Sequence, residues 1–540
     1  MKRLRDIYQK YLLPSLSVRG WWACLLLLAA CTPSVPTTFE EATWEPAVSP
    51  NNFGATLPPN IAPLNFRILR GDASEAVTHL HSLKGGEIIV TGWDVCFDED
   101  DWHRLLEQTR GDSLYCDIYL KAYGTWEHLP TQRFFIAEEE IDPYITYRLI
   151  RPSYVNYEEL SLVERNMQNF DERTFYSNMP LSRDGNGQCA NCHVPQRQGQ
   201  SGRSQFHARQ AFGGTVFING KDISKVNLKT DSTLSAGVYP AWHPTLNLIV
   251  YSVNETGQVF HTLDPQKIEV IDYGSDLIVY DLDNNEVRSL TRTGNDYESF
   301  PTWSPDGKTL YYISAHHELQ GESIDADLDQ NYQSLHYNIY ARDFDPTTHR
   351  FGPTRLVFDA EALGKSASTP RVSPDGRWLL FSLADYGQFH IWHRSADLCT
   401  LNLGTADAPD EQGDLNSPES DSYHSWSSNG RWILFSSRRI DGNYTRLYLS
   451  YFDSQGHAHR PVLLPQRRPQ HYGELFRSFN AAEWMTRPVG PSPRNLEDAL
   501  RRDARQARYA GSALAAPETE ETAPEQRITK QNFHNIYEND

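Results

Sequence analysis

The stretch "PTWSPDGKTLYYIS" at residues 301–314 decides the fold, because its template recurs along the chain. Two further copies, "PRVSPDGRWLLFSL" and "HSWSSNGRWILFSS", lie at 370–383 and 424–437, and a worn copy, "PAWHPTLNLIVYSV", lies at 240–253. The Pro-Asp-Gly sequence predicts a tight turn, since proline fixes φ and a glycine such as Gly307 tolerates positive φ. Aliphatic and aromatic residues follow the turn, so each copy predicts a β-hairpin.

Each copy is followed by a second predicted hairpin, such as "DLIVYDLDNNEVRSLT" at 276–291. Four antiparallel strands that recur in this way form the blade of a β-propeller. The stretch "GGTVFINGKDISKVNL" at 213–228 looks like the outer half of another blade, which "ELFRSFNAAEW" at 474–484 would complete. Joining the first and last segments in one blade would close the ring. We therefore expect a mainly β chain with a propeller over residues 207–485 that has five blades, or six as the alternative.

Residues 61–180 form a separate strand-rich part of the sequence. Four stretches in it carry β-branched and aromatic residues with partial alternation: "NFRILRG", "GEIIVTGWDVCF", "LYCDIYLKAYG" and "ITYRLIRP". They predict a small sandwich-like β domain, with short helices at 98–111 and 157–175. Cys96 and Cys116 lie on neighbouring predicted strands. A disulfide between them is expected in an oxidising compartment, with two buried free thiols as the alternative.

The first thirty residues are typical of an export signal, because a basic region precedes the apolar run "WWACLLLLAA" at 21–30. This run is too short to span a bilayer. It ends in "LAAC" at 28–31, which resembles a bacterial lipobox, and the resemblance implies lipid attachment at Cys31. An ordinary secretory peptide with a chance cysteine is the alternative. Thr32 follows, which implies sorting to the outer membrane under the rule known for such lipoproteins. Residues 31–60, rich in Pro and Thr, predict a flexible tether.

The chain is acidic, with 50 Lys and Arg against 70 Asp and Glu and a formal net charge of −20. A surface of this charge repels phosphate backbones, so nucleic acid is not expected as a partner. Contact with a membrane is expected through the lipid anchor only. The last part of the chain, residues 486–540, predicts a charged and partly disordered tail with a short helix near 495–509.

A second motif, "CANCH" at residues 189–193, carries the chemistry. The C-x-x-C-H spacing is the attachment signature of c-type haem. Cys189 and Cys192 would bind the two vinyl groups through thioethers, and His193 would be an axial ligand of the iron. A zinc site is the first alternative, but it normally needs four ligands and no second C-x-x-C exists in the sequence. A redox disulfide is the second alternative, but the surrounding segment, 181–206, has the composition of a loop.

The sixth coordination position of such a haem needs a ligand from elsewhere in the chain. His207 follows His193 by fourteen residues, at the start of the expected propeller, and is our candidate for the distal ligand. An ordinary surface or core histidine is the alternative for His207. Two histidine ligands would give a lower reduction potential than a histidine and methionine pair.

The whole arrangement resembles a group of Bacteroidetes-type exported lipoproteins often described as cytochrome c or TolB-like. The blades carry the S-P-D-G-[KR]-x-[IL]-x-[FY] signature of TolB-like repeats. The resemblance implies an outer-membrane lipoprotein, facing the periplasm, with one haem c. The leading hypothesis is a monohaem c-type cytochrome that transfers single electrons, or supports a redox or envelope protein docked on its propeller. The alternative is an interaction scaffold in which the haem is structural. No catalytic constellation for an enzyme is found in the sequence.

Overall fold

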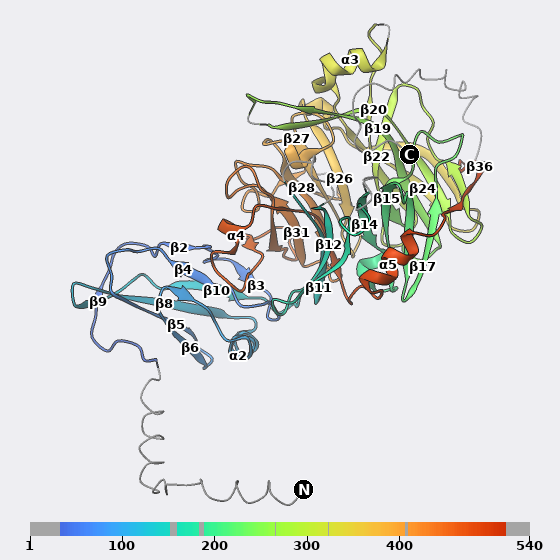
Figure 1. Ribbon diagram of the computed structural model, residues 1–540. Helices are drawn as coiled ribbons and strands as arrows, with labels where there is room; N and C mark the ends of the chain where they lie inside the picture. Colours follow the sequence, from blue (N-terminus) through green and yellow to red (C-terminus); the bar gives the residue numbers. More distant parts are fainter. Residues whose placement is uncertain are drawn as a thin grey trace, which may run out of the picture.

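The computed structural model describes residues 33–151, 159–182, 188–264, 266–321, 323–405 and 409–514. Within them the protein is mainly β, as expected, with an N-terminal domain set against a larger group of sheets (Figure 1). The export signal and Cys31 lie outside the described residues, as do residues 515–540 of the predicted tail. None of the helices in the described part is both long and apolar enough to cross a membrane.

The N-terminal domain consists of two sheets and one helix. The larger sheet contains β1 (Glu40–Glu41), β3 (Thr56–Leu57), β5 (Glu75–Ser82), β6 (Glu87–Thr91), β8 (Ser113–Ala122), β9 (Thr125–His128) and β10 (Gln132–Ile136). The smaller sheet contains β2 (Val48–Ser49), β4 (Phe66–Ile68) and β7 (Asp94–Val95). The helix expected at 98–111 is confirmed as α2 (Glu99–Thr109), whose N-cap, Asp98, accepts hydrogen bonds from the backbone of Asp100 and Asp101. The helix packs its buried residues, Trp102 among them, against β5, β6 and β8.

Six further sheets follow: four have four strands each, and two have a fifth strand from the C-terminal segment; in five of the sheets the first four strands form an antiparallel meander. In sequence order, the first two of these sheets contain β14 (Gln188–Pro195), β15 (Arg203–Gln210), β16 (Gly214–Asn219) and β17 (Asp222–Asn227), and then β18 (Val238–Trp242), β19 (Leu248–Phe260), β20 (Ile268–Asp281) and β21 (Glu286–Ser289). The third sheet contains β22 (Asp296–Trp303), β23 (Thr309–His316), β24 (Asn338–Asp345) and β25 (Arg350–Phe358), and the fourth contains β26 (Ser366–Val372), β27 (Trp378–Ala384), β28 (Asp397–Asn402) and β29 (Asp410–Glu411). The fifth sheet contains β30 (Asp421–Trp426), β31 (Trp432–Ser437), β32 (Arg446–Tyr451) and β33 (Val462–Leu463). The sixth combines β11 (Tyr144–Ile150), β12 (Ser161–Asn166) and β13 (Glu172–Ser177) with β34 (Ser478–Met485).

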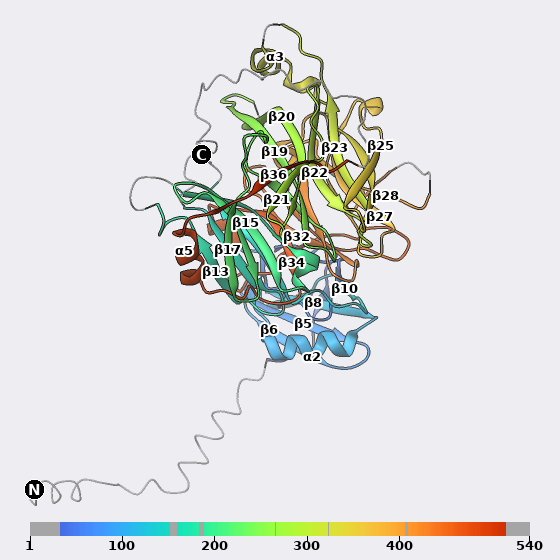
Figure 2. The ribbon, with the colours of Figure 1, turned by 90° about the vertical axis from the view of Figure 1, so that its right-hand side faces the viewer.

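Each of these sheets has one end strand that meets the end strands of two other sheets. We call these six the inner strands: β34, β14, β18, β22, β26 and β30. In this order each contacts the next, and β30 contacts β34. Figure 2 shows the sheets from the side, with the segment that ends in β36 running across their outer strands.

The sheet that contains β34 corrects two predictions. A helix was predicted at 157–175, but this stretch forms β12 and the start of β13. The reason is non-local pairing: β11 pairs with β12 on one side and with β34 on the other, antiparallel in both cases. The sequence places β11 to β13 before the expected boundary at residue 180, whereas in the structure these strands share a sheet with β34 and so belong to the larger group of sheets. The count of six sheets differs from the five units expected first from the repeats and equals the alternative of six.

The turns of the repeat template are confirmed. Gly307 has φ +69° between β22 and β23, and the glycines of the other two copies have φ +76° and +67°. The Ser304 hydroxyl donates to Asp306 Oδ1 at 2.6 Å and accepts from the backbone N–H of Thr309 at 3.0 Å. The same pair of bonds recurs at Ser373 and Ser427. The template is thus a side-chain-bonded turn that fixes the start of the second strand.

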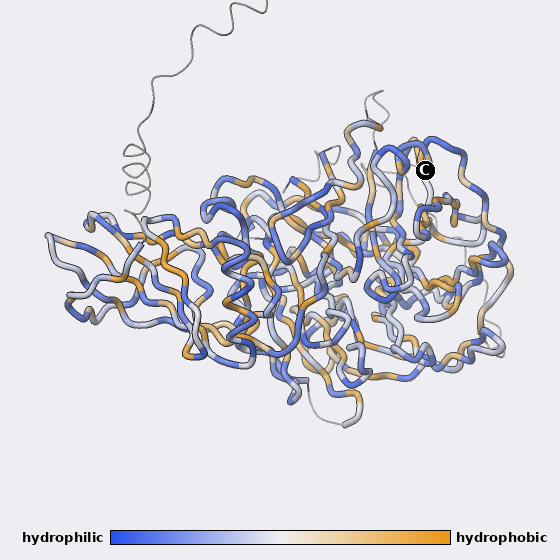
Figure 3. The backbone as a smooth tube through the Cα atoms, turned by 90° about the horizontal axis from the view of Figure 1, so that it is seen from below, coloured by the Kyte–Doolittle hydropathy of each residue, from blue (hydrophilic) through white to orange (hydrophobic). Residues whose placement is uncertain are grey.

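The two parts share a hydrophobic core, and apolar segments alternate with hydrophilic ones throughout the chain (Figure 3). One buried cluster contains Trp102 of the N-terminal domain together with Trp432 and Trp484 of β31 and β34. The segment after β34 is also packed: α5 (Pro493–Leu500) buries Leu496 and Leu500, and β35 (Arg505–Gln506) and β36 (Arg508–Ser512) pair in parallel with β17 and β21.

Candidate functional site

The C-x-x-C-H motif lies on an inner strand and not in the loop that its composition predicts. Residues 189–191 pair with β15, and the register then shifts between Asn191 and Val194. Cys192 and His193 fall in this shift, where Cys192 has φ +55°. An extra residue in one strand is a β-bulge, which bends the strand and re-aims its side chains. The bulge therefore decides where the second cysteine and the histidine point.

The same bulge occurs in every inner strand. Each has a register shift of its own and, at that shift, a non-glycine residue with φ between +47° and +55°. These bulge residues are Cys192, Tyr239, Phe300, Thr369, Tyr423 and Ala481. All of them line one cavity, to which every inner strand contributes. Positive φ is costly for side chains other than glycine, so its recurrence marks a position that the fold imposes.

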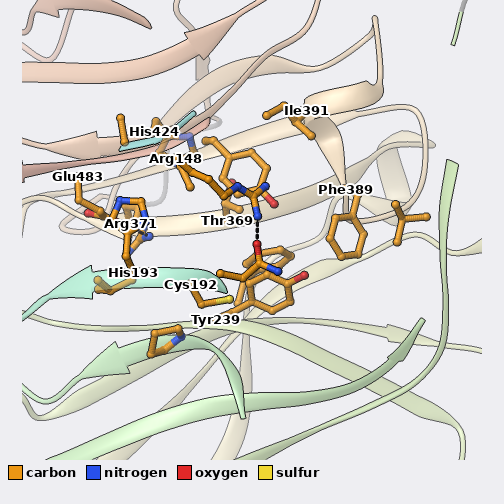
Figure 4. Close-up of a pocket in the computed structure, with 18 of the residues that line it drawn as sticks. Arg148, Cys192, His193, Tyr239, Thr369, Arg371, Phe389, Ile391, His424 and Glu483 are labelled. Atoms are coloured by element: carbon orange, nitrogen blue, oxygen red, sulfur yellow. Dashed lines mark hydrogen bonds and ion pairs between the residues drawn. The ribbon is translucent and has the colours of Figure 1, made fainter. Parts of the chain in front are cut away.

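This central cavity has a volume of about 150 Å³ and walls of mixed character (Figure 4). Aromatic and aliphatic side chains, including Phe300, Phe389 and Ile391, cover much of its wall. The polar part includes three arginines and one glutamate: Arg148, Arg209, Arg371 and Glu483. Arg371 Nη2 forms an ion pair with Glu483 Oε1 at 2.9 Å, and Arg148 donates to the Asn191 side chain. The arginines thus bring positive charge to a largely apolar cavity.

His193 is the most unusual polar group on this cavity. Its side chain is buried, and neither ring nitrogen makes a well-formed hydrogen bond among the described residues, although the Thr146 backbone lies near enough to raise its pKa against the effect of burial. Burial lowers the pKa of His193 to about 4, so the ring is neutral at pH 7 and one of its nitrogens carries a free lone pair. Leaving a buried polar group unpaired costs about 1–3 kcal/mol. Such a group in a cavity wall points to a ligand that the chain itself does not supply.

The two cysteines of the motif face different surroundings. Cys192 lines the central cavity beside Tyr239 (Figure 4). Cys189 is fully buried in a hydrophobic cluster with Tyr176 and Phe206 and is not part of the cavity wall. Burial raises the pKa of both thiols, so both are protonated at pH 7. Attachment of one group to both sulfurs therefore requires the start of β14 to shift.

His207, the predicted distal ligand, lies elsewhere. It is a buried residue of β15 whose Nδ1 is 3.2 Å from Thr215 Oγ1, and burial lowers its pKa to about 3. It lines a separate cavity with Leu234 and Asn254, and it is not part of the central cavity wall. The structure therefore does not bring His207 together with His193.

His424 is the second histidine of the central cavity, and the sequence analysis missed it as a site residue. It follows the bulge residue Tyr423 as His193 follows Cys192. Its Nε2 donates to the Leu380 carbonyl at 3.1 Å, whereas the buried Nδ1 makes no well-formed hydrogen bond among the described residues, although the Thr369 backbone lies near the ring. Burial lowers the pKa of His424 to about 3. The signal was present in the repeat, since His424 stands where the other copies at 301 and 370 have proline.

The predicted disulfide is wrong. Cys96 and Cys116 are both free thiols. Cys116 lies in β8 with its side chain buried in the core, whereas Cys96 follows β7 of the other sheet and is exposed, with Sγ 4.0 Å from the Arg467 carbonyl oxygen. The two sulfurs are apart because the cysteines belong to different sheets, with the Cys116 side chain in the core and the Cys96 side chain at the surface.

The central cavity has residue types that a covalent haem needs, but their arrangement departs from such a site in two respects. An unpartnered imidazole, the adjacent thiol of Cys192, aromatic walls and arginines that can pair with carboxylates form a suitable donor set. The first departure is the position of Cys189, described above. The second is size: about 150 Å³ is less than the roughly 300–1,000 Å³ of pockets for larger ligands, so the wall must open to admit a macrocycle.

No protein-family model and no curated protein matches the sequence. Among solved structures, the chain is similar to TolB from Acinetobacter baumannii, with 13% identity and a TM-score of 0.37 over 68% of this chain and 86% of that one. It is also similar to an oligogalacturonate lyase from Vibrio parahaemolyticus, with 10% identity and a TM-score of 0.29 over 76% of this chain and 100% of that one. At these values the similarities assign the chain to no family, and no function is transferred from them.

Proposed function

We propose that the chain is a monohaem c-type cytochrome, with one haem c attached through Cys192 and Cys189 and with His193 as its axial ligand. The observation that carries this proposal is the buried His193 ring, which makes no well-formed hydrogen bond among the described residues and stands next to a thiol in the wall of the central cavity. When bound, the haem would supply a one-electron redox centre. The proposal includes the lipid anchor at Cys31, an outer-membrane location facing the periplasm, and a redox or envelope protein as partner.

We propose further that the six sheets are the blades of a TolB-like propeller. Support comes from the cycle of contacts among the inner strands and from the sheet in which β34 pairs with β11. That pairing joins residues more than three hundred positions apart in the sequence. In a propeller such a blade would close the ring. We also propose that the two sheets of the N-terminal domain form a small sandwich-like unit.

The cavity residues have separate tasks in this proposal. His193 is kept neutral by burial, so its lone pair is available at pH 7. Phe300, Phe389 and Ile391 exclude water and lower the local polarity. The arginines would pair with the carboxylates of the bound group. His424 takes the place of His207 as the candidate second nitrogen donor, because its Nδ1 makes no well-formed hydrogen bond among the described residues and its ring lines the same cavity.

The experiment that tests this function uses the full chain, expressed together with a c-type cytochrome maturation system. We expect one covalent haem by mass spectrometry and an absorption spectrum that changes when dithionite is added. Cys192→Ala should remove one of the two thioether bonds and Cys189→Ala/Cys192→Ala should abolish the adduct, whereas His207→Ala should leave both the adduct and the spectrum unchanged. Wild-type chain that is folded, exported and free of covalent haem would overturn the proposal.

A second candidate is an interaction scaffold with a structural haem. The observation in its favour is that every inner strand contributes to the wall of the central cavity, so a group bound there would contact all six sheets. Haem-loaded chain that shows no potential-dependent spectral change at accessible potentials, yet keeps binding an envelope partner, would favour the scaffold over the electron carrier.

A further inference from the structure

A cluster of histidines lies far from the central cavity, on the larger sheet of the N-terminal domain. In the register of β5 with β8, His79 stands directly opposite Asp117 and His81 opposite Tyr115. In the register of β8 with β9, His128 stands opposite Tyr119. Side chains two residues apart in a strand point to the same face. The three histidines and Asp117 therefore share one face, while Leu80 and Ile118 fill the core on the other.

The distances around Asp117 are those of a compact ligand set. His81 Nε2 lies 2.9 Å from Asp117 Oδ2, and His79 Nδ1 lies 3.9 Å from the same oxygen. The three ligand atoms all lie within 4.8 Å of one another. A tetrahedral zinc ion with bonds of about 2.0–2.1 Å holds its ligands about 3.3 Å apart. Small side-chain movements would bring the three atoms to that separation.

The outer nitrogens of two rings are held by carboxylates. His79 Nε2 lies 2.7 Å from Glu87 Oε2, and His128 Nδ1 lies 2.8 Å from Glu41 Oε2. The other nitrogen of each ring faces Asp117, at 3.9 Å for His79 and 3.2 Å for His128. A carboxylate on the far nitrogen of a metal-bound histidine is the usual outer-shell arrangement, because it fixes the ring and raises its basicity.

The charges in this arrangement suit a cation. Asp117, Glu87 and Glu41 each place a carboxylate oxygen within 2.9 Å of a histidine ring of the cluster. Thr131 donates to Asp117 Oδ1 at 2.7 Å, which leaves Oδ2 to face His79 and His81. The three carboxylates of the cluster outnumber any permanent positive charge among its histidines, which favours a divalent ion.

We propose that His79 Nδ1, His81 Nε2 and Asp117 Oδ2 bind a divalent transition-metal ion of the zinc class. Imidazole and carboxylate ligands suit Zn²⁺, Cu²⁺ and Ni²⁺. Glu87 positions His79, while His128 and Thr131 hold the other oxygen of Asp117. The ligand side chains are 12–26% exposed, so the ion enters from solvent and keeps a fourth position for water. The site links β5 to β8 and is independent of the haem proposal.

The test is a zinc titration of the purified full chain after removal of metals with a chelator, followed by calorimetry. The expected result is one Zn²⁺ site in the wild type that is absent from Asp117→Asn and from His81→Gln. Glu87→Gln should keep the site but weaken it roughly 10–100-fold, as the loss of an outer-shell carboxylate does. His316→Gln is the matched control, because His316 also sits 2.6 Å from the Asp296 carboxylate and 3.9 Å from that of Glu318, but the described residues hold no compact set of three ligand atoms there.

A spectroscopic readout keeps the test decisive. Co²⁺ in a site of few ligands gives d–d absorption, and we expect this band in the wild type and His316→Gln but not in His81→Gln. Circular dichroism checks that each variant is folded; if Asp117→Asn is not, His79→Gln and His81→Gln decide the outcome. The proposal is overturned if wild type and folded ligand variants take up the same amount of Zn²⁺, or if the wild type takes up none.

Discussion

His193 in the central cavity and His81 on the N-terminal sheet show two ways of holding a histidine. The fold buries His193 and leaves both of its ring nitrogens without a well-formed hydrogen bond among the described residues. The fold leaves His81 partly exposed and places it 2.9 Å from a carboxylate. Burial without a partner favours the neutral ring and disfavours the folded state, whereas a carboxylate partner stabilises a cation on the ring or beside it. The difference teaches that the first site is prepared for an uncharged donor and the second for positive charge.

The largest effect should come from acidifying the central cavity. Burial holds the pKa of His424 at about 3, against about 6.5 in the unfolded chain. The unfolded chain therefore binds a proton that the folded chain refuses, so stability is complete above pH 6.5 and is lost as the pH falls toward 3. At pH 4.5 this loss is about 2–3 kcal/mol for one such ring. Urea unfolding of wild type and His424→Gln at pH 7 and 4.5 measures it, and the variant should lose less stability between the two values.

His316 provides the control for that measurement, because its neighbourhood has the opposite effect. The hydrogen bond with Asp296 raises the pKa of His316, so its contribution to stability is present below pH 6.5 and fades as the pH rises through the raised pKa. His316→Gln should therefore not reduce the acid loss. An acid loss in His424→Gln equal to that of the wild type would show that the cavity is hydrated enough to accept the proton.

The next effect concerns the N-terminal cluster in the metal-free chain. Asp117 accepts a hydrogen bond from Thr131 at 2.7 Å and lies within 3.2 Å of nitrogens of His81 and His128. Replacement by alanine leaves these groups without their shared acceptor, and bonds to a charged group contribute about 1.5–3 kcal/mol. Asp117→Ala should therefore lower the free energy of unfolding by about 2 kcal/mol at pH 7, measured with urea in the presence of a chelator. An unchanged midpoint would mean that water replaces the carboxylate at no cost.

How far the sequence predicts this molecule depends on how local each feature is. The hairpin turns could be predicted because Ser304, Asp306 and Gly307 interact within five positions of one another. The strands at 161–166 and 172–177 could not, since the apolar spacing there fits a helix as well and the pairing of β11 with β34 decides between them. Non-local pairing overrides local preference in such segments.

The candidate site divides in the same way. The motif itself singles out Cys192 and His193, because its spacing has a chemical meaning. His424 carries no motif, and its place in the cavity follows from a bulge that recurs in every inner strand. His207 is the candidate because it is close to His193 in sequence, but its position in β15, which pairs with β16, directs its side chain to a different cavity. Sequence distance is a poor measure of direction in a sheet.

A smaller pair of effects, opposite in sign, sharpens the comparison directly. In haem-free chain, His193→Leu replaces an unpartnered buried polar group with an apolar one, so the free energy of unfolding should rise by about 1 kcal/mol. His81→Leu removes a ring that has a carboxylate partner, so the free energy of unfolding should fall by about 1 kcal/mol. Urea unfolding at pH 7 without metal measures both. A decrease for His193→Leu would mean that His193 has partners in solution, and it would weaken the case for a ligand at this ring.

The smallest effect separates the stability of the N-terminal cluster from its metal affinity. The Glu87 side chain is 60% exposed, so its contact with His79 lies mostly in water and is screened by salt. Glu87→Gln in the metal-free chain should therefore change the free energy of unfolding by less than about 0.5 kcal/mol, and the change should vanish at high ionic strength. The same substitution is expected to weaken zinc binding far more than this, because Glu87 fixes the orientation of the His79 ring and that orientation matters most when the ring binds an ion. If stability and zinc affinity fell by the same free energy, Glu87 would be an ordinary structural partner of His79. In that case Asp117 alone would distinguish this cluster, which favours positive charge, from the central cavity, which favours a neutral ring.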